Sequence, residues 1–391
     1  MTDKHDSYDV LIAGGGVIGL ACAWRAAQRG LRVAVLEREA FGAGASGVAA
    51  GMLAPVGEAS WGEERLLGFN LASLRLWEGF AAELADEAGI DFGYGRLGAL
   101  HVALDRDEAE ALQRRSELHH RLGLESRRLR PSECRRLEPA LSTAVAGGVE
   151  APGEAAVDPA RLCEALAVAV EGGGGTLKAG AEIVELELNR DAVAVRTALG
   201  EVYRAPRLVL CTGAWSAAEW VPPEHRPPVR PVRGEILTLR GSAEAPVCER
   251  IIAGERVYLV PRGDGRLVVG ASVEERGFET AVSAGAVHEL LREAYRLLPE
   301  ISELEFAGAR SGLRPGTPDN LPLVGASGET GLILACGHYR NGVLQAPATA
   351  EVVGALLAGD TSPVDAAALS PERFRGDRAA RRRSRREAVA R

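Results

Sequence analysis

The first 36 residues alternate between apolar runs and one helical pattern. Residues 8–13 (YDVLIA) and 32–36 are apolar runs of strand length, and residues 18–29 between them have the spacing of a helix. A glycine-rich GGGVIG segment separates the first run from the helix. This order predicts a β-α-β unit of a parallel sheet.

The rest of the chain shows two further patterns. Long stretches with helical periodicity alternate with short apolar or alternating runs, and no internal repeat is visible. The pattern predicts helices at residues 63–88, 105–122 (capped by Asp105 with Glu108), 287–298 and 343–357, and strands at residues 177–184, 192–197, 207–216, 234–239, 256–261, 266–271 and 332–336.

The connections between these elements divide the chain. Residues 222–231 are rich in proline and predict an extended connector, after which the strands lose the β-α-β order. Residues 313–319 (LRPGTPD) predict a turn around one arginine. The predicted fold class is therefore α/β plus α+β, with a Rossmann-like domain and a smaller antiparallel-sheet domain.

Length, charge and cysteines narrow the class of protein. A chain of 391 residues exceeds what one core usually supports, so we expect two domains. Apolar runs fall well short of the roughly 20 residues that a membrane span needs, and no secretory signal is apparent, so we expect a cytoplasmic protein without membrane insertion. The six cysteines lack metal-ligand spacing, and we expect reduced, structural thiols.

The C-terminal end differs in charge from everything before it. Residues 371–391 carry nine arginines against three acidic residues, whereas the whole chain has a net charge of −8. We expect residues 373–391 to be a solvated, disordered basic tail. Binding of RNA or of an acidic surface by this tail is the alternative, although one aromatic residue and no surrounding fold argue against nucleic acid as a partner.

Glycines in the β-α-β unit predict a dinucleotide site. Gly14, Gly16 and Gly19 fit G-x-G-x-x-G, which permits the tight turn, the close approach of a pyrophosphate and the close packing of helix on strand. Glu37 follows at the end of the second strand, where a carboxylate accepts hydrogen bonds from ribose hydroxyls. The motif does not separate NAD from FAD.

Two other segments predict close approach of backbone to a ligand. Residues 42–55 (GAGASGVAAGMLAP) are too small to build a core, so their amides and the Ser46 hydroxyl suit something flat or charged; a flexible linker is the alternative. The strand ending in Thr212 and Gly213 suggests the same, with a plain turn as the alternative. The loop at residues 337–342 is expected to direct a second helix N-terminus toward the ligand of the first unit. If that ligand is a flavin, the positive end of the helix would stabilise the negative charge that reduction produces.

Four motifs carry a resemblance to a known family. GGGVIGL, GASGVAAGMLAP, GLRPGTPDNLP and GHYRNGVLQAPATA together resemble the D-amino-acid-oxidase-type flavoproteins, most closely the glycine oxidases of bacterial thiamine biosynthesis. The resemblance covers the chain to about Phe374 and implies FAD as cofactor. It implies a discontinuous FAD-binding domain of residues 1–90, 147–225 and 306–372, and a substrate domain of residues 91–146 and 226–305.

The same resemblance assigns residues to the two ligands position by position. Arg314 would bind the substrate carboxylate through a bidentate pair, with Arg340 and the Tyr258 hydroxyl beside it. From the residues alone, Arg314 holding its turn by bonding carbonyls, Arg340 pairing with an acid and Tyr258 belonging to the core remain open. The residues implied to contact FAD are Gly14, Gly16, Val17, Ile18, Gly19, Glu37, Arg38, Ala45, Ser46, Ala50, Gly51, Met52, Val184 (through its backbone), Gly213, His338, Tyr339, Arg340, Asn341, Gly342, Val343 and Leu344.

The implied reaction is transfer of hydride from the substrate α-carbon to the flavin without a side-chain acid or base. Glycine is the implied substrate, molecular oxygen the acceptor, and a homo-oligomer, guessed as a tetramer, the implied assembly; no metal is expected. Three departures from the family, Arg256, Val273 and Arg310, leave other substrates open. These are sarcosine or a small D-amino acid such as D-alanine; an RNA-associated flavoprotein and a non-catalytic FAD scaffold are the rivals from other classes.

Overall fold

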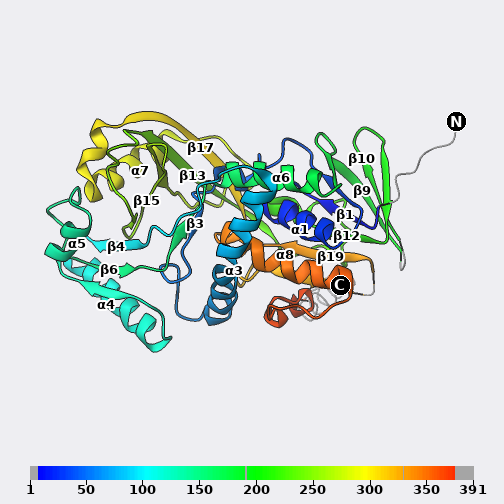
Figure 1. Cartoon of the computed structure of the whole chain (residues 1–391), viewed down its shortest axis with the longest axis horizontal. Helices are drawn as coiled ribbons and strands as arrows, with labels where there is room; N and C mark the ends of the chain where they lie inside the picture. The colour runs from blue at the N-terminus through cyan, green and yellow to red at the C-terminus, as the bar shows by residue number, and fades with distance from the viewer. Residues whose placement is uncertain (1–7, 190–191, 329, 375–391) are drawn as a thin grey trace, which may run out of the picture. The chain divides into compact units, whose positions relative to one another are not determined.

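The computed structural model describes residues 8–189, 192–328 and 330–374, which form two compact units. Within these described residues, unit 1 comprises residues 8–43, 166–189, 192–230, 315–328 and 330–374, and unit 2 comprises residues 44–165 and 231–314. Each unit has its own sheets, drawn in Figure 1. Among the described residues, no helix has both the length and the apolar composition required to cross a membrane.

Unit 1 is built on a six-stranded, mainly parallel sheet (Figure 1). The sheet carries the predicted β-α-β unit at its centre, and its central strands are completely buried because both faces are covered. Only its edge strand β18 runs antiparallel. The strand order is β18 (Leu323–Ala326), β19 (Leu332–Cys336), β12 (Arg207–Leu210), β1 (Val10–Ala13), β2 (Val33–Leu36) and β8 (Thr176–Lys178).

Helices and a smaller sheet complete unit 1. Helices α1 (Val17–Gln28) and α8 (Gly342–Ala358) pack against each other, as Figure 1 shows, and both are rich in small buried residues that allow a close approach. An antiparallel sheet of β9 (Ile183–Leu188), β10 (Val193–Thr197) and β11 (Val202–Ala205) adds its buried face to the same core. The 3₁₀ turns are Gly213–Ala217, Ala367–Leu369 and Pro371–Phe374.

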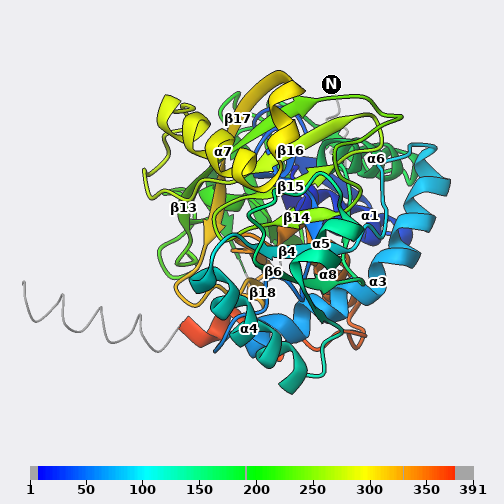
Figure 2. The ribbon, with the colours of Figure 1, turned by 90° about the vertical axis from the view of Figure 1, so that its left-hand side faces the viewer.

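Unit 2 is built on an eight-stranded sheet. Its strand β14 runs parallel to β4, and the pairs β13–β16, β16–β15, β15–β14, β4–β6 and β6–β5 run antiparallel. Figure 2 shows β16, β15, β14, β4 and β6 in succession. The strand order is β17 (Glu305–Gly316), β13 (Arg230–Arg240), β16 (Arg266–Gly270), β15 (Tyr258–Pro261), β14 (Ile251–Ala253), β4 (Ala99–Ala103), β6 (Gly147–Ala151) and β5 (Arg127–Leu129).

Short strands and helices cover this sheet. Helix α7 packs on β16, and its apolar residues join the largest core of the unit. A two-stranded ribbon pairs β3 (Met52–Leu53) with β7 (Ala155–Ala156). The helices outside unit 1 are α2 (Ala45–Val48), α3 (Glu64–Ala88), α4 (Arg106–Arg121), α5 (Pro131–Leu137), α7 (Ala284–Leu297) and the 3₁₀ turn Pro299–Glu303, while α6 (Pro159–Gly172) crosses the unit boundary.

Most predicted elements are present, and the exceptions have local causes. The cap of α4 is confirmed, since Asp105 accepts a hydrogen bond from the Glu108 amide at 2.9 Å. The predicted strand at 177–184 is wrong, because the chain turns at Gly180, whose φ is +72°, and divides the segment into β8 and β9. The predicted strand at 207–216 ends at Leu210 in a 3₁₀ turn, and the predicted turn at 313–319 begins inside β17.

The start of the basic tail also differs from the expectation. Arg373 bonds both carboxylate oxygens of Asp319, at 2.8 and 3.2 Å, and Phe374 packs on the core of unit 1. These two residues therefore belong to the folded unit, and residues 375–391 lie outside the described residues. All six cysteines are buried free thiols, as expected.

Candidate active site

The predicted dinucleotide turn of unit 1 is built so closely that side chains are excluded. Gly14 has a φ of +103°, and a Cβ there would lie 2.5 Å from the Cys211 carbonyl oxygen. A Cβ on Gly19 would collide with the Gly14 carbonyl oxygen. Helix α1 can approach β1 this closely only because position 19 is a glycine, and its N-terminus is thereby fixed beside the turn.

The start of α1 suits an anion. Its N-cap is Gly16, which has no side chain to cap the helix, and its first turn contains no acidic residue. Glu37 at the end of β2 accepts hydrogen bonds from the amides of Gly15 at 2.7 Å and Glu39 at 3.0 Å. The Glu37 carboxylate is therefore fixed at the mouth of the turn, and each of its oxygens retains a second lone pair for a ribose hydroxyl.

Arg38 makes a contact that the sequence did not suggest. Its guanidinium lies 3.7 Å from the ring centroid of Trp215, and its Nε pairs with Glu39 at 3.1 Å. Trp215 belongs to the 3₁₀ turn that begins at Gly213, where φ is +53°. The turn that follows Thr212 thus places an aromatic ring against Arg38. The tryptophan two residues after the Thr-Gly pair was the feature of the sequence that could have predicted this contact.

The loop before α8 supplies the second helix N-terminus. Gly337 and Tyr339 have φ values of +79° and +48°, and the Tyr339 amide donates to the Pro315 carbonyl at 3.0 Å. The helix then starts at Gly342 with no capping side chain and no acidic residue in its first turn. Arg340 lies over the Tyr339 ring at 5.4 Å.

The His338 side chain faces the protein interior. Its Nε2 lies 3.0 Å from the Thr349 hydroxyl, and burial lowers the pKa of the imidazole to about 3, so that it is neutral. Any contact of His338 with a cofactor would therefore use its backbone. Val184 in β9 has an exposed side chain.

In unit 2 the segment of small residues also packs tightly. Gly51 has a φ of +71°, its carbonyl accepts from the Val157 amide at 2.9 Å, and the Ala50 carbonyl accepts from the Arg262 guanidinium. Burial lowers the pKa of Arg262 to about 10. Residues 45–53 therefore form the short helix α2, a turn and strand β3, and not the flexible linker that was the alternative.

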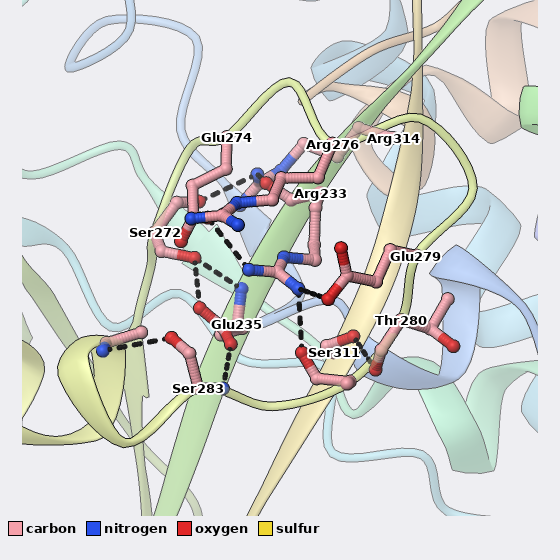
Figure 3. A network of polar contacts seen from close by, with 12 residues as sticks. Arg233, Glu235, Ser272, Glu274, Arg276, Glu279, Thr280, Ser283, Ser311 and Arg314 are labelled. Atoms are coloured by element: carbon pink, nitrogen blue, oxygen red, sulfur yellow. Dashed lines mark hydrogen bonds and ion pairs between the residues drawn. The ribbon is translucent and has the colours of Figure 1, made fainter.

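Arg314 lies against the backbone of two neighbouring segments of unit 2 (Figure 3). Its Nη1 donates to the carbonyls of Ser272 at 3.0 Å and Arg233 at 3.4 Å. A Cβ on Gly234 would collide with the guanidinium, so the group lies flat on that glycine. Within the described residues, Nε and Nη2 of Arg314 make no hydrogen bond, so that edge of the guanidinium is open to a carboxylate.

Tyr258 reaches the same end of β16 as Arg314. It pairs across the sheet with Gly270, the last residue of that strand, and a Cβ there would lie 2.5 Å from the tyrosine hydroxyl. Ser272, which holds Arg314, follows two residues later. Two of the three side chains predicted to bind the carboxylate, Arg314 and Tyr258, therefore lie at the same end of β16, whereas Arg340 belongs to unit 1. Val273, which follows Ser272, is 59% exposed.

The other two departures lie at the surface. Arg310 is exposed on β17, four residues before Arg314 and therefore on the same face of that strand. Arg256 is also exposed, and its contact with Glu289 is a loose 4.0 Å. Sequence reasoning missed Glu235, Ser272 and Gly234, although a glycine inside an apolar strand marks a close approach.

Known proteins match this chain along most of its length. The family model for FAD-dependent oxidoreductases of the DAO type matches residues 9–356. The chain belongs to this family. A glycine oxidase from Geobacillus kaustophilus is 35% identical over 94% of this chain and 98% of its own length. A crystal structure of glycine oxidase from Geobacillus kaustophilus matches with a TM-score of 0.88, at 34% identity, over 93% of this chain and 98% of that one.

A longer relative is also similar. The bifunctional protein ThiO/ThiG of a Synechocystis strain is 35% identical over 94% of this chain, but the chain spans only about half (54%) of that protein. The fold class expected from the sequence is confirmed by the crystal structure of the glycine oxidase, and membership in the family makes FAD the cofactor.

The residues of unit 1 fit FAD. The glycine turn and two uncapped helix starts without acidic residues suit a pyrophosphate and a flavin that becomes negative on reduction. Glu37 is fixed where a ribose hydroxyl would be bound. Gly14, Gly16 and Glu37 would hold the nucleotide part.

Proposed function

We propose that this FAD-dependent oxidoreductase oxidises glycine. The amine is oxidised to an imine, which water hydrolyses to glyoxylate and ammonia, and molecular oxygen finally takes up the two electrons and two protons as hydrogen peroxide. The observation that carries the proposal is the open edge of the Arg314 guanidinium, held at the end of β16 against which Tyr258 lies, in a chain that is similar to glycine oxidases along nearly its whole length.

The side chains of this chain act by orientation. Arg314 binds the substrate carboxylate through Nε and Nη2, and the Tyr258 hydroxyl donates a further hydrogen bond to it. Arg340 is proposed as a second cation for the same carboxylate. Bound FAD supplies the acceptor for the hydrogen and electron pair that leave the α-carbon. No side-chain acid or base is assigned, which agrees with the neutral His338 bonded to Thr349.

The proposed FAD contacts of unit 2 are Ala45, Ser46, Ala50, Gly51 and Met52, which line the pyrophosphate and ring side. Those of unit 1 lie in the glycine turn with Val17, Ile18 and Gly19, at Glu37 and Arg38, at Val184 and Gly213, and in the segment His338, Tyr339, Arg340, Asn341, Gly342, Val343 and Leu344.

Sarcosine is the second candidate substrate. Val273 follows the residue that holds Arg314 and is shorter than the residue that the resembling enzymes can carry there, which favours room for an N-methyl group. One methyl group in a tight pocket changes discrimination by about 1–3 kcal/mol. D-Alanine tests the same space on the α-carbon.

The first experiment adds glycine anaerobically to the purified holoprotein while the visible flavin spectrum is recorded. Bleaching, followed by recovery and peroxide on admission of air, is the expected result. A spectrum that glycine leaves unchanged but sarcosine or D-alanine bleaches would replace the proposed substrate, and kcat/KM for the three amines ranks them.

Arg314→Ala tests the residue assigned to the carboxylate. The variant is expected to retain FAD and to lose at least about a hundredfold in kcat/KM, since a charge-assisted bidentate pair contributes on the order of 3 kcal/mol. Arg240→Ala, which removes an exposed arginine from the end of the neighbouring strand β13, is the matched control. Glycine kinetics of Arg314→Ala equal to those of the control would contradict the assignment.

The setting of the reaction is part of the proposal. Since this chain is similar to glycine oxidases and to ThiO/ThiG proteins, its product imine would serve the thiazole branch of thiamine biosynthesis. The reaction would take place in the cytoplasm, and the active form would be a homo-oligomer. Mass measurement of the native holoprotein tests the assembly. Truncation before residue 375, with unchanged kinetics and no loss of salt-dependent RNA binding, would exclude a role of the basic end in nucleic-acid binding.

A further inference from the structure

Residues 233–235 of β13 contribute to both faces of the sheet. Side chains alternate along a strand, so Gly234 faces one side while Arg233 and Glu235 face the other. On the first side the Arg314 guanidinium lies on Gly234. On the second side two charged side chains, 1% and 0% exposed, lie directly behind that glycine.

Glu235 holds Ser272 through both its backbone and its side chain (Figure 3). The Ser272 hydroxyl donates to Glu235 Oε2 at 3.0 Å and accepts from the Glu235 amide at 3.0 Å. The Ser272 amide donates to the Glu235 carbonyl at 3.2 Å. Because Ser272 is held at three points, the direction of its own carbonyl, which binds Arg314 at 3.0 Å, is determined by Glu235.

The second carboxylate oxygen of Glu235 anchors the far end of the same loop. Oε1 accepts from the Ser283 amide at 2.6 Å, and Ser283 caps α7 through the Ala286 amide. Among the described residues Glu235 forms no ion pair within 4.0 Å, so its buried carboxylate is bound by neutral donors alone. The Arg233 guanidinium interacts electrostatically with this carboxylate but does not bond it, so the hydrogen bonds from Ser272 and Ser283 determine its orientation.

Arg233 secures the middle of the loop independently. Its Nη2 donates to Glu274 at 2.8 Å and its Nη1 to the Ala281 carbonyl at 2.8 Å. Ser311 on β17 adds a hydrogen bond to the Thr280 carbonyl at 2.6 Å (Figure 3). The loop therefore has anchors that do not pass through Ser272, and loss of Glu235 need not release all of it.

We infer that Glu235 and Ser272 are positioning residues for the substrate carboxylate, acting through Arg314. The chain of contacts runs from the Glu235 carboxylate to the Ser272 hydroxyl, and from the Ser272 carbonyl to Arg314 Nη1. It holds one edge of the guanidinium so that Nε and Nη2 face the ligand in one orientation. This inference rests on the proposed function, in which Arg314 binds that carboxylate.

The experiment measures carboxylate binding separately from turnover. Acetate carries the carboxylate but no amine, so its titration of the flavin spectrum of the holoprotein gives a Kd without reaction. Ser272→Ala and Glu235→Ala are expected to raise the Kd of acetate and the KM of glycine about tenfold, the effect of about 1.4 kcal/mol, while FAD content and kcat change little. Glu235→Gln, which keeps an acceptor oxygen, is expected to restore most of the affinity.

Ser311→Ala is the matched control, since it removes one hydroxyl from the same network without touching Ser272. Unchanged acetate and glycine affinities in Ser272→Ala, or an equal loss in Ser311→Ala, would overturn the inference in favour of a purely structural network. If Glu235→Ala does not fold, Ser272→Ala decides alone.

Failure of the proposed function would be seen elsewhere, in wild-type protein whose flavin glycine does not reduce. The acetate titration of the variants would still decide the inference in that case. A wild-type flavin spectrum that acetate leaves unchanged at every concentration would overturn the inference as well, because Arg314 would then hold no carboxylate.

Discussion

The proposed nucleotide site of unit 1 and the proposed carboxylate site of unit 2 differ in the kind of atoms that form them. In unit 1 the nucleotide turn consists of backbone, with glycines at the points of closest approach and two helix starts that lack capping side chains. In unit 2 the carboxylate site consists of side chains, Arg314 and Tyr258, held by further side chains behind them. A backbone site depends on the absence of Cβ atoms, whereas a side-chain site depends on a chain of contacts.

This difference determines how strongly a substitution in each unit affects ligand binding. A new Cβ in the backbone turn meets main-chain atoms, which cannot move without moving a helix or a strand. A new Cβ under Arg314 meets the end of a flexible side chain, which can move by rotation. A substitution in the turn of unit 1 should therefore abolish FAD binding, whereas a substitution under Arg314 in unit 2 should weaken substrate binding only partly.

The largest effect is expected for Gly19→Ala. The new methyl group collides with the Gly14 carbonyl oxygen, so α1 must move away from β1 and its N-terminus leaves the phosphate position. Overpacking costs about 1–3 kcal/mol in stability, and the loss of bound FAD adds to it. Purified Gly19→Ala protein should contain little FAD, measured by absorbance, and should melt at a lower temperature than wild type.

Gly68→Ala is the control for this prediction. It makes the same change inside helix α3, where nothing lies within 4 Å of the new Cβ, so FAD content should be unchanged and stability unchanged or raised by up to about 1 kcal/mol. Normal FAD content in Gly19→Ala would show that the turn tolerates a side chain and that the distinction between the two units is wrong.

The same contrast explains what the sequence could predict of the site. The backbone turn of unit 1 is contiguous, so the spacing of Gly14, Gly16 and Gly19 was visible without a structure. The network around Arg314 joins residues separated by 37, 42 and 81 positions, and no spacing rule links them. Arg314 was found only through resemblance to a family, and Glu235 and Ser272 were not found.

The fold was predictable to a similar extent. Long amphipathic helices such as α3 and buried parallel strands such as β1 and β2 have strong periodicity, and their positions were predicted within a few residues. Strand β17 was missed because its polar residues and its Leu-Arg-Pro-Gly end have the composition of a turn, and pairing with β13 overrides that local preference. Strand pairing across long separations is a property of the whole sheet.

Away from Arg314, unit 2 also contains two buried ionisable side chains with atoms that lack hydrogen-bond partners. Glu154 and His101 are buried, their Oε2 and Nε2 atoms lie 4.0 Å apart, and neither atom has a hydrogen bond. Burial, together with Glu58, raises the pKa of Glu154 from 4.5 to about 8, and burial, together with Arg115, lowers the pKa of His101 from 6.5 to about 3. Both groups are therefore neutral near pH 7.

The two shifts make stability depend on pH in opposite directions. Between pH 4.5 and 8 the unfolded chain releases the Glu154 proton that the folded chain keeps, so the free energy of unfolding falls as the pH rises through this window. Below pH 6.5 the unfolded chain takes up a proton at His101 that the folded chain refuses, so stability falls as the pH drops.

Glu154→Gln should therefore remove the alkaline part of the dependence. The variant keeps an oxygen that can accept from the Gly57 amide but has no proton to lose, so its advantage over wild type should grow from pH 5 to pH 9, by up to several kcal/mol. Thermal melts of the two proteins across this range measure the difference, and Glu117→Gln on exposed helix α4 is the control. Parallel melting curves against pH would contradict the raised pKa of Glu154.

The smallest effect is expected for Gly234→Ala. It is the same change in unit 2 as Gly19→Ala in unit 1, which is expected to abolish FAD binding. The new methyl group meets only the end of the Arg314 side chain, so the sheet should form and FAD should stay bound. The displaced guanidinium should raise the KM of glycine about tenfold, as expected for the loss of about 1.4 kcal/mol in binding, with a smaller change in kcat.

Gly263→Ala, in a turn of the same unit with open space around its Cα, provides the comparison for Gly234→Ala. If Gly234→Ala lost FAD or failed to fold, the glycine would be a backbone requirement like Gly19 and the side chain of Arg314 would be fixed more rigidly than its contacts imply. If KM stayed at the wild-type value, Arg314 would tolerate displacement, and its Nη1 contact with Ser272 could not be what orients the substrate carboxylate.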